Sequence, residues 1–381
     1  MTTGLLASII IDNYNYEKFI GEAIDSALKQ TYPNIEVIVV DDGSTDRSRE
    51  IIAGYEKKVI TILKENGGQA SAFNAGFKNC KGDVIFFLDS DDVLFTNGVQ
   101  NIMSVFYTNK NISKIHWPLW IVDEKGVKTG GTRPLISSLP EGDFKDVVLN
   151  GGPTSCISSP TSGNAWSRQF LEKIFPMPEE VSYYKTCADE YLYTLAPVFG
   201  EIKAIKEPQG FYRIHGKNIY SALSFDRMLE LELEGHGQQT AALGSVLKKH
   251  GFSVDEDAWR RNSWFHLLKA AMDDINTHIP LEDDVIVVDD ESWRMKEIFP
   301  GRKVLPFLEL DGLYNGAPET DAVAITDLNR LIKTGAKYIA FAKQSFWWLT
   351  QYPEFSRYIQ SHFSCVLQNE RIKIFDLKCE L

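Results

Sequence analysis

The chain has 381 residues, of which 44% are hydrophobic and 12% aromatic, and this composition excludes an intrinsically disordered protein. Its formal net charge of -12 argues against a nucleic-acid-binding surface, because such a surface needs clustered basic residues. The five cysteines are scattered and form no Cys-x-x-Cys pair, which argues against structural zinc and a disulfide framework and favours a reducing compartment.

The sequence contains no apolar run that approaches the roughly 20 residues needed to cross a bilayer. Its N-terminus lacks the basic and apolar regions of a secretion signal. We therefore expect a soluble, cytoplasmic protein without a transmembrane segment, with a peripheral position at the inner face of the membrane as the alternative.

The first 90 residues alternate between two periodicities. Short, continuous apolar stretches predict buried strands at 6–11, 35–40, 59–63 and 83–88. Apolar residues at helical spacing predict helices at 17–29, 45–55 and 69–79. Repeated strand–helix units of this kind predict an α/β fold whose Rossmann-like, mainly parallel sheet is covered by helices on both faces.

Polar residues follow each of these predicted strands. In chain order they are Asp12 and Asn13, then Asp41 and Asp42, then Lys64 to Asn66, then Asp89 to Asp92. Ligands of mainly parallel sheets bind beyond the carboxyl ends of the strands. We therefore expect these side chains to converge on one crevice.

The pattern is less regular from residue 95 to residue 215. It predicts a helix near 98–107 and a strand near 114–122. A long polar stretch rich in Gly, Pro and Ser at 129–164 is typical of a functional loop or a lid. Residues 225–277 then have a helical pattern.

A second strand–helix alternation begins near residue 284. It predicts strands at 285–288, 338–342, 363–367 and 372–377, a helix at 319–333, and a helix containing Trp347 and Trp348. This segment has no glycine-rich phosphate loop, and the two tryptophans favour core and interface over a ligand site. We predict an N-terminal α/β domain at 1–222, a helical connector at 223–278 and a small α/β domain at 279–381.

The segment from Val84 to Asp92 is the most informative stretch of the chain. A buried strand ends there in three carboxylates, and the extended backbone would point Asp89 and Asp91 toward the same ligand. Paired carboxylates suit Mg²⁺ or Mn²⁺, usually together with substrate phosphates. Asp92 is expected to cap the next helix.

Four ordered motifs in the first 92 residues resemble those of the family 2 glycosyltransferases. They are Ser8 to Asn15, Val40 to Asp46, Asn74 to Gly76, and Leu88 to Asp92. The resemblance extends over about residues 1–220 and implies an inverting, nucleotide-sugar-dependent enzyme of the GT-A fold. It does not extend to the C-terminal α/β segment.

The resemblance implies a role for each matching position. Asp42 would contact the nucleotide base, Asp89 would lie near the ribose, and Asp91 would bind the metal that bridges the diphosphate. Asp12 and Asn13 replace the residues that family members more often carry before Tyr-Asn. The complete expected nucleotide-sugar site is Asn13, Tyr14, Asp41, Asp42, Asn66, Gln69, Asp89, Ser90, Asp91 and Arg213.

Two later motifs complete the expected site. Asp189 matches the catalytic aspartate of an acidic motif at a helix start, and Glu190 competes with it because Ala188 replaces the usual preceding acid. Tyr212 to His215 resembles a Tyr-Arg-x-His motif in which the histidine approaches the diphosphate or its metal. Metal-binding roles are therefore expected for Asp91 and His215.

The acceptor region is expected around Gly163, Asn164 and Trp166, which precede an amphipathic helix. Relatives meet the donor sugar and the acceptor in this part of the chain. Trp166 has two interpretations at this point, because its ring could stack on a sugar or belong to the core.

The expected reaction transfers a hexosyl or N-acetylhexosaminyl group from a nucleotide-diphosphate donor, UDP foremost, to an acceptor hydroxyl with inversion. The acceptor would be a saccharide, a lipid-linked molecule or another hydroxyl compound in bacterial surface polysaccharide or glycan synthesis. Homo-oligomer formation and partner docking through residues 279–381 both stay open. Neither the sugar nor the acceptor can be identified from the sequence.

Three alternative functions predict other features of the sequence. A sugar nucleotidyltransferase usually carries a glycine-rich, basic loop near its N-terminus, whereas the first strand here leads into Asp12 and Asn13. A dinucleotide-dependent oxidoreductase would need a glycine fingerprint at the same turn. A non-catalytic nucleotide-sugar-binding scaffold, whose C-terminal domain docks a partner, would be favoured by loss of Asp91 or of the acids near 189.

Overall fold

The computed structural model describes residues 4–55, 57–109, 111–216, 224–289, 293, 299 and 301–380. Two compact units divide the chain: the N-terminal unit is Met1–Ala222 with Glu234–Ser263, and the C-terminal unit is Leu223–Leu233 with Trp264–Leu381. The predicted boundary between 222 and 223 falls outside the described residues. The helices predicted within 225–277 are present but are divided between the units, and the predicted domain limits stay a prediction.

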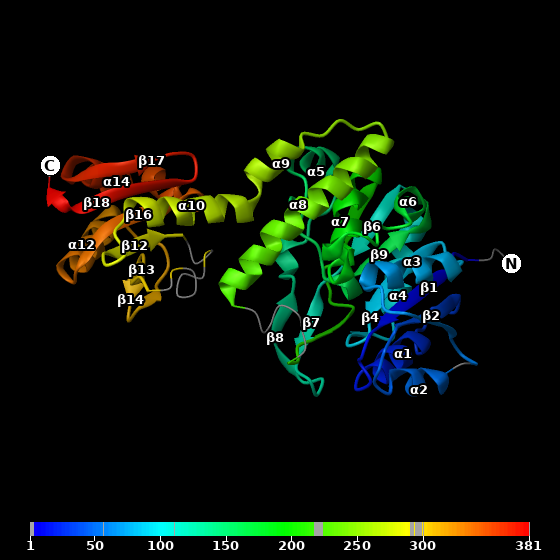
Figure 1. The fold of residues 1–381 in the computed structure, drawn as a ribbon. Helices are drawn as coiled ribbons and strands as arrows, with labels where there is room; N and C mark the ends of the chain where they lie inside the picture. The colour runs from blue at the N-terminus through cyan, green and yellow to red at the C-terminus, as the bar shows by residue number, and fades with distance from the viewer. Residues whose placement is uncertain are drawn as a thin grey trace. The chain divides into compact units, whose positions relative to one another are not determined.

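The N-terminal unit is built on a mainly parallel sheet with the strand order β10-β6-β9-β4-β1-β2-β3 (Figure 1). Its strands are β1 (Ala7–Asn13), β2 (Ile35–Asp42), β3 (Ile60–Lys64), β4 (Val84–Asp89), β6 (Ile112–His116), β9 (Asn164–Ser167) and β10 (Glu201–Ala204). Strands β1 to β4 run parallel, whereas β9 is antiparallel to both β4 and β6. The strands predicted in the first 90 residues are therefore confirmed.

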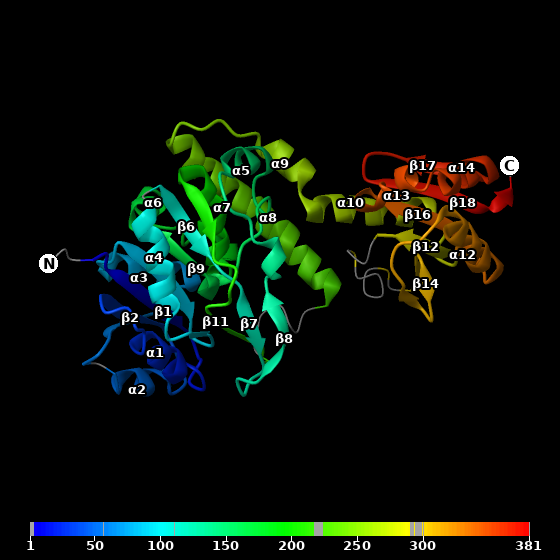
Figure 2. The same ribbon diagram turned by 180° about the vertical axis from the view of Figure 1, so that it is seen from behind.

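A smaller sheet lies beside the carboxyl end of β4 and has the order β5-β11-β7-β8 (Figure 2). Its strands are β5 (Val93–Leu94), β7 (Leu119–Val122), β8 (Lys128–Arg133) and β11 (Gly210–Arg213). The single strand predicted at 114–122 is wrong, because β6 and β7 belong to different sheets. Pro118 has no amide hydrogen for a sheet, and the amide of Trp117 donates instead to the carbonyl of Gly163 at 3.0 Å.

Helices cover both faces of the large sheet. They are α1 (Ile20–Leu28), α2 (Ser48–Ala53), α3 (Gln69–Asn79), α4 (Gly98–Thr108), α5 (Lys145–Gly151), α6 (Arg168–Ile174) and α7 (Ala188–Phe199). Successive strand residues point to opposite faces, so Ile9 and Ile11 pack with α1, α2 and α4. Ile10 and Phe87 face the other side and pack with α3, α6 and α7.

The predicted loop at 129–164 is only partly irregular. It contains most of β8, the helix α5 and the short turns η1 (Ile136–Ser138) and η2 (Thr161–Gly163). A further turn, η3 (Ser182–Lys185), precedes α7. A single open loop is therefore the wrong description of this segment, because Val148 of α5 is 1% exposed and packs into the core.

Gly76 permits α3 to lie close against β1, since a Cβ at this position would overlap the Ile10 side chain. Alanine at 76 should therefore lower the free energy of unfolding by about 1–3 kcal/mol, despite its better helix propensity. Gly21→Ala is the matched control, because a Cβ there would meet its nearest atom at 3.7 Å. Urea unfolding should show Gly21→Ala to be neutral or stabilising; equal losses in both variants would contradict the packing argument.

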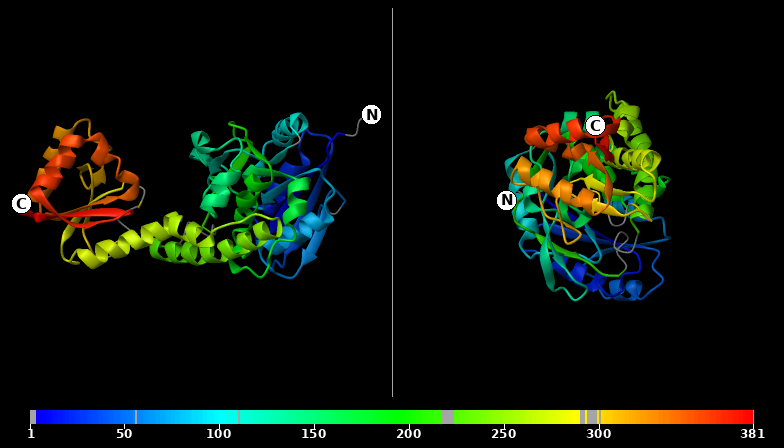
Figure 3. Two further views of the ribbon diagram at one scale, coloured as in Figure 1. Left: turned by 90° about the horizontal axis from the view of Figure 1, so that it is seen from above. Right: turned by 90° about the vertical axis from the view of Figure 1, so that its left-hand side faces the viewer.

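The C-terminal unit has a separate sheet of order β13-β12-β16-β18-β17. Its elements are β12 (Asp284–Val288), β13 (Val304–Pro306), β16 (Ala336–Ala342), β17 (Phe363–Gln368), β18 (Ile372–Glu380), the hairpin β14 (Glu309–Leu310) and β15 (Leu313–Tyr314), and α10 (Trp264–His278), α12 (Asp321–Lys333), α13 (Trp348–Gln351) and α14 (Pro353–His362). Helix α10 covers one face of the sheet, and α12, α13 and α14 cover the other (Figure 3). The small α/β segment expected from the sequence is thus present.

Two details of this unit refine the sequence prediction. The helix expected around the two tryptophans is interrupted, since α14 begins at Pro353 after a break at Tyr352. Trp348 is fully buried whereas Trp347 is 43% exposed. Among the described residues of the whole chain, no helix is both long enough and apolar enough to span a bilayer.

The remaining helices are α8 (Phe225–Lys249) and α9 (Glu256–Asn262). Leu243 and Leu247 of α8, together with Trp259 of α9, are buried against the core of the N-terminal unit. Phe225 and Leu229 at the start of α8 are buried in the core of the C-terminal unit. The beginning of α8 therefore contributes to the core of the C-terminal unit, and its later turns contribute to the core of the N-terminal unit.

Candidate functional site

Three carboxylates meet where β4 ends. Asp89, Asp91 and Asp92 each place an oxygen within 4.8 Å of the others. The parallel register of β1 and β4 sets Asp12 opposite Asp89, so a fourth carboxylate stands beside the three. The convergence of acids at this sheet edge that the sequence predicts is therefore present.

Burial and mutual repulsion disfavour the charged forms of these acids. Burial, followed by the neighbouring acids, raises the pKa of Asp89, and burial with the charge of Asp91 raises the pKa of Asp92. Burial is also the main reason that the pKa of Asp12 rises to about 8. A divalent cation would relieve this repulsion, and an all-oxygen donor set suits Mg²⁺ or Mn²⁺. Asp89, Asp91 and Asp92 therefore fit such an ion.

The segment after β11 closes one side of this acid cluster. His215 places Nε2 2.9 Å from Oδ2 of Asp91, and its ring stacks on Phe19. The Arg213 side chain donates to Glu22 at 2.6 Å and to the carbonyl of Asp91 at 2.9 Å. His215 thus reaches the expected metal ligand, whereas protein groups hold the guanidinium of Arg213.

Asp92 does not cap a helix, contrary to the sequence prediction. Helix α4 begins only at Gly98, and its N-cap residue Asn97 makes no side-chain cap bond. Oδ1 of Asp92 instead accepts the backbone amide of Arg213 at 2.9 Å. Asp92 therefore joins the acid cluster and ties it to β11.

Gln69 connects the acid cluster to the start of α7. Its Nε2 donates to Oδ1 of Asp89 at 3.2 Å, and its Oε1 accepts the amide of Ala188 at 2.9 Å. Asp189, the next residue, has its pKa raised to about 6, mainly by burial. The nearby Thr161 side chain acts in the opposite direction and lowers the pKa of Asp189. Asp189 is thus a carboxylate poised near neutral pH beside the acid cluster.

Glu190 has a different environment from its neighbour. Its Oε1 accepts a hydrogen bond from the Tyr183 hydroxyl at 3.1 Å, and its Oε2 accepts one from Nε2 of Gln239 at 3.0 Å. Both carboxylate oxygens of Glu190 are therefore engaged by side chains of the protein. Of the two acids left open by the sequence, Asp189 has the environment that suits a proton acceptor.

The loops after β1, β2 and β3 form a second carboxylate network. Asp42 accepts the backbone amides of Gly67 at 3.0 Å and Gly68 at 2.7 Å, and Asn66 donates to the Asp42 carbonyl at 3.0 Å. Asp41 is fully buried and accepts a hydrogen bond from Nε of Arg49 at 2.6 Å. Burial raises the pKa of its carboxyl, but hydrogen bonds from Ser44, Arg49 and Asn13 outweigh burial and hold that pKa below the usual range.

Asn13 and Tyr14 lie beside this network. Nδ2 of Asn13 donates to Asp41 at 3.0 Å, so this side chain supports the loop after β2. Tyr14 is 47% exposed and lies on the surface of the loop after β1. Of the two, only Tyr14 has a side chain placed to meet a ligand from solvent.

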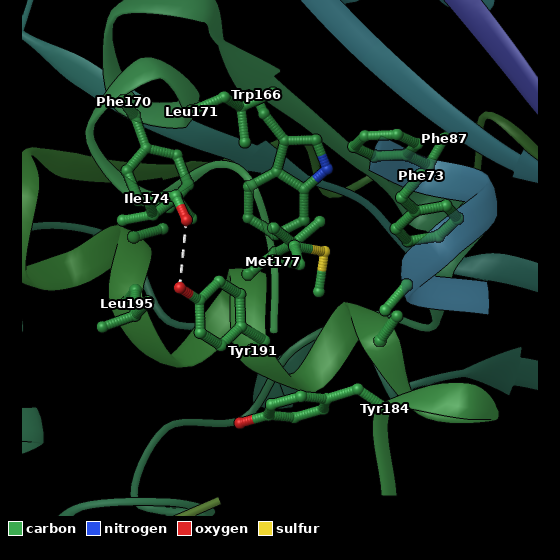
Figure 4. Close-up of a cluster of buried hydrophobic side chains, with 14 of the residues drawn as sticks. Phe73, Phe87, Trp166, Phe170, Leu171, Ile174, Met177, Tyr184, Tyr191 and Leu195 are labelled. Carbon is green, nitrogen blue, oxygen red and sulfur yellow. Dashed lines mark hydrogen bonds between the residues drawn. The ribbon is translucent and has the colours of Figure 1, made fainter. Parts of the chain in front are cut away.

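The expected acceptor residues are interior ones. Trp166 is 1% exposed and packs with Phe170 and Phe87 in the core shown in Figure 4. Asn164 is fully buried, and its Nδ2 donates to the carbonyls of Ser159 and Pro160. The buried position of Trp166 agrees with the core interpretation and not with sugar stacking. The acceptor role expected for Asn164 is corrected, because its side chain does not reach the surface of the site.

Gly163 and Ser90 are buried as well. A Cβ at Gly163 would lie 2.5 Å from that of Ser159, so glycine is needed for close packing there. Ser90 is 2% exposed within the acid turn.

The sequence predicts no role at the level of the single residue for Asp12, Thr161 and Ser162, although Asp12 is among the polar residues expected to converge beyond the strand ends. The register of two parallel strands could have indicated Asp12, since it stands opposite Asp89. Thr161 and Ser162 gave no signal, because they lie about seventy residues from the acid turn; Oγ of Ser162 nevertheless accepts the Asp89 amide at 3.0 Å.

Comparison with known proteins shows a family match over the part of the chain that carries the acid cluster. Residues 8–158 match Glycosyl transferase family 2. An uncharacterized glycosyltransferase of Nostoc sp. is 39% identical over 218 residues, which are 55% of this chain and 65% of that protein. One from Rickettsia prowazekii is 43% identical over 122 residues, which are 32% and 38% of the two chains. The chain thus spans less than two thirds of either relative.

Solved structures include S. aureus TarS 1-349 in complex with UDP-GlcNAc, which is 18% identical with a TM-score of 0.48 over 72% of this chain and 82% of that one. The mannosyltransferase PcManGT from Pyrobaculum calidifontis, in complex with GDP-Man and Mn²⁺, is 16% identical with a TM-score of 0.47 over 74% and 77%. The family match and the strand order confirm the predicted GT-A class. The match to glycosyl transferase family 2 thus covers residues 8–158, which include the acid cluster at the end of β4.

Proposed function

We propose that the protein is an inverting glycosyltransferase that moves a sugar from a nucleotide-diphosphate donor to an acceptor hydroxyl. The observation that carries the proposal is the pairing of two kinds of carboxylate at one sheet edge. Asp89, Asp91 and Asp92 form a cluster that suits a metal and a diphosphate. Asp189 is a separate acid whose pKa is raised to about 6.

Different residues of the chain have different roles in a single displacement at the anomeric carbon. Asp189 accepts the proton of the acceptor hydroxyl while that oxygen attacks the anomeric carbon from the face opposite the leaving diphosphate. No covalent intermediate is needed, and one displacement inverts the anomeric centre. Gln69 keeps Asp189 in register with the acid cluster, because its amide bonds both Asp89 and the first turn of α7.

Asp89, Asp91 and Asp92 would hold a Mg²⁺ or Mn²⁺ ion in this proposal. When bound, such an ion supplies Lewis-acid stabilisation of the charge that develops on the leaving diphosphate. His215 keeps the Asp91 carboxylate oriented through its 2.9 Å contact. UDP is the first nucleotide to test, because the family resemblance makes UDP-sugars the most common donors.

The proposed biological context is the synthesis of a bacterial surface polysaccharide or another glycan in the cytoplasm, with a saccharide or lipid-linked acceptor. This context is supported by the resemblance to the family. We also propose that residues 279–381 recognise the acceptor or a partner, since the donor residues named above all precede residue 216.

Calorimetric titration of UDP, GDP and dTDP, each with and without Mn²⁺, is the direct test of the proposed site. We expect one nucleotide to bind with a requirement for metal, and Asp91→Ala to weaken that binding by at least about 10-fold, since ligands and their partners typically contribute 10–100-fold to metal affinity. Asp257→Ala, which alters an exposed acid of α9, is the matched control and should bind as the wild type does.

Two results of this titration would count against the proposal. If no nucleotide binds under any condition, the non-catalytic scaffold becomes the better description. If binding persists unchanged without metal and in Asp91→Ala, the acid cluster has no role in donor binding.

The rate of transfer should fall as the pH drops through about 6, because only the ionised form of Asp189 accepts a proton. Above that pH the carboxylate is ionised and the rate should reach a plateau. The measurement is kcat at saturating donor and acceptor between about pH 5 and 8. An acid limb near pH 4, the range of an ordinary aspartate, would contradict the raised pKa of the proposed base.

A further inference from the structure

Lys114 is a fully buried lysine in β6, which lies between the edge strand β10 and β9 in the large sheet. Its Nζ donates to Oγ of Ser158 at 2.6 Å. It also lies 5.6 Å from the ring centroid of Trp166 and 5.7 Å from that of Tyr193. Tyr193 is one helical turn beyond Asp189 on α7, so Lys114 faces the side of α7 that carries Asp189.

Ser158 connects Lys114 to a short segment, residues 158–164, that borders the site. Oγ of Ser158 donates to Oδ1 of Asn164 at 3.1 Å. Nδ2 of Asn164 in turn donates to the carbonyls of Ser159 and Pro160 at 2.9 and 2.7 Å. The segment is therefore folded around the Asn164 amide, with Lys114 fixing one end.

The outer side of this segment contacts both parts of the proposed site. The Thr161 side chain lies close enough to the carboxyl of Asp189 to lower its pKa. The neighbouring Ser162 accepts the backbone amide of Asp89 through Oγ at 3.0 Å. Hydrogen bonds thus connect Lys114 to the 158–164 segment and the segment to the acid cluster, while Thr161 of the same segment lies beside the proposed base.

Charge adds a second connection between Lys114 and Asp189. The ionisable groups whose charges act on Lys114 are Cys156, Asp189 and His116, and those on Asp189 include Lys114 and Asp89. Burial lowers the pKa of Lys114 to about 7, whereas the carboxylate of Asp189 favours the ammonium form. The ammonium in return favours the ionised form of Asp189.

We propose that Lys114 is a positioning residue for the transfer reaction, which holds the 158–164 segment beside Asp189 and places its ammonium toward the side of α7 that carries this acid. This inference rests on the proposed function, because it gives Asp189 the role of base. Because Lys114 is fully buried, it would act through the segment and through Asp189 rather than by touching a donor or an acceptor.

A lysine that served only the fold would be a poor choice for this position. A buried ammonium loses its hydration, and an apolar side chain of similar volume is often as stable or more stable there. Lys114→Met should therefore have a Tm at pH 7 equal to or above that of the wild type while its catalytic site is impaired. A large fall in Tm would instead indicate that the lysine serves folding.

The decisive measurement follows the Asp189 carboxyl directly by carbon-13 NMR in the full-length chain labelled at aspartate, with Asp189→Asn to assign the signal. In Lys114→Met and Lys114→Gln, we expect its titration midpoint to move to higher pH by about 1 pH unit. Lys203→Met is the matched control, because Lys203 lies on the neighbouring strand β10 and pairs with Glu141. An unmoved midpoint in both Lys114 variants would overturn the inference.

The two parts of the proposal are separated by a further variant. Ser158→Ala retains the ammonium but breaks the hydrogen bond to the segment, so the Asp189 midpoint should stay near that of the wild type while turnover of UDP-glucose, used as the probe, falls at least about 10-fold. Full turnover in Ser158→Ala would overturn the positioning part. Undiminished turnover in Asp189→Asn would reject the proposed function itself, independently of any shift that Lys114 causes.

Discussion

Replacing Asp189 with asparagine should lower kcat for sugar transfer by about 10²–10⁴-fold, the usual contribution of a general base. Asparagine has nearly the same shape but cannot accept a proton at neutral pH. The measurement is transfer at saturating donor and acceptor, with calorimetry of the nucleotide on the same variant. Nucleotide affinity should be unchanged, because the acid cluster that is proposed to bind the metal remains intact.

Glu190→Gln is the matched control for this experiment. The Glu190 carboxylate accepts hydrogen bonds from Tyr183 and Gln239, so its role is to hold α7 against η3 and α8. We expect its kcat to fall less than 10-fold. If Glu190→Gln were inactive and Asp189→Asn retained its rate, the base would be Glu190 and the environment of Asp189 would have been misjudged.

Replacing Trp166 with alanine should cost about 3–5 kcal/mol of the free energy of unfolding, the range measured for large buried aromatics. The ring is 1% exposed and packs with Phe170, Leu171 and Phe87, so its loss leaves a cavity between the sheet and α6 (Figure 4). Urea unfolding followed by circular dichroism measures this cost, and Trp166→Phe should recover part of it.

Trp120→Ala provides the comparison for this variant. Trp120 lies on β7 in the smaller sheet of the same unit, where its ring is only partly buried and meets Nζ of Lys128 at 4.3 Å. Loss of the Trp120 ring should lower the free energy of unfolding by less than half as much as loss of the Trp166 ring does. A stable Trp166→Ala protein with impaired use of an acceptor would restore the sugar-stacking role that the buried position of Trp166 argues against.

The local pattern of the sequence was sufficient for most of the fold. Uninterrupted apolar stretches indicated β1 to β4 because both sheet faces are covered, and helical spacing indicated α3 over its observed range. The predicted strand at 114–122 was wrong because apolar character continues through Trp117 while the chain passes from one sheet to another. An apolar pattern indicates that a segment is buried, but it does not indicate which of two sheets the segment joins.

The candidate site was predictable where one strand end supplied it and unpredictable where distant segments meet. Asp89 and Asp91 could be found from a single turn, and the acidic motif at 189 from its resemblance to relatives. Lys114 and Thr161 gave no such signal, since their contacts with Ser158 and Asp189 depend on β6, β9 and α7 folding together. A polar residue in an apolar strand looks like a local irregularity until its partner is known.

The two hydrogen bonds of the Gln69 side chain limit which residues could replace it. Its amide donates to Asp89 with the nitrogen and accepts from Ala188 with the oxygen, so both polarities of one planar group are used. Glutamate would present only acceptors to an acidic neighbour, and lysine would present only donors to a backbone amide. Variants designed to test other donors or acceptors should therefore keep Gln69 unchanged and alter an exposed residue such as Tyr14 instead.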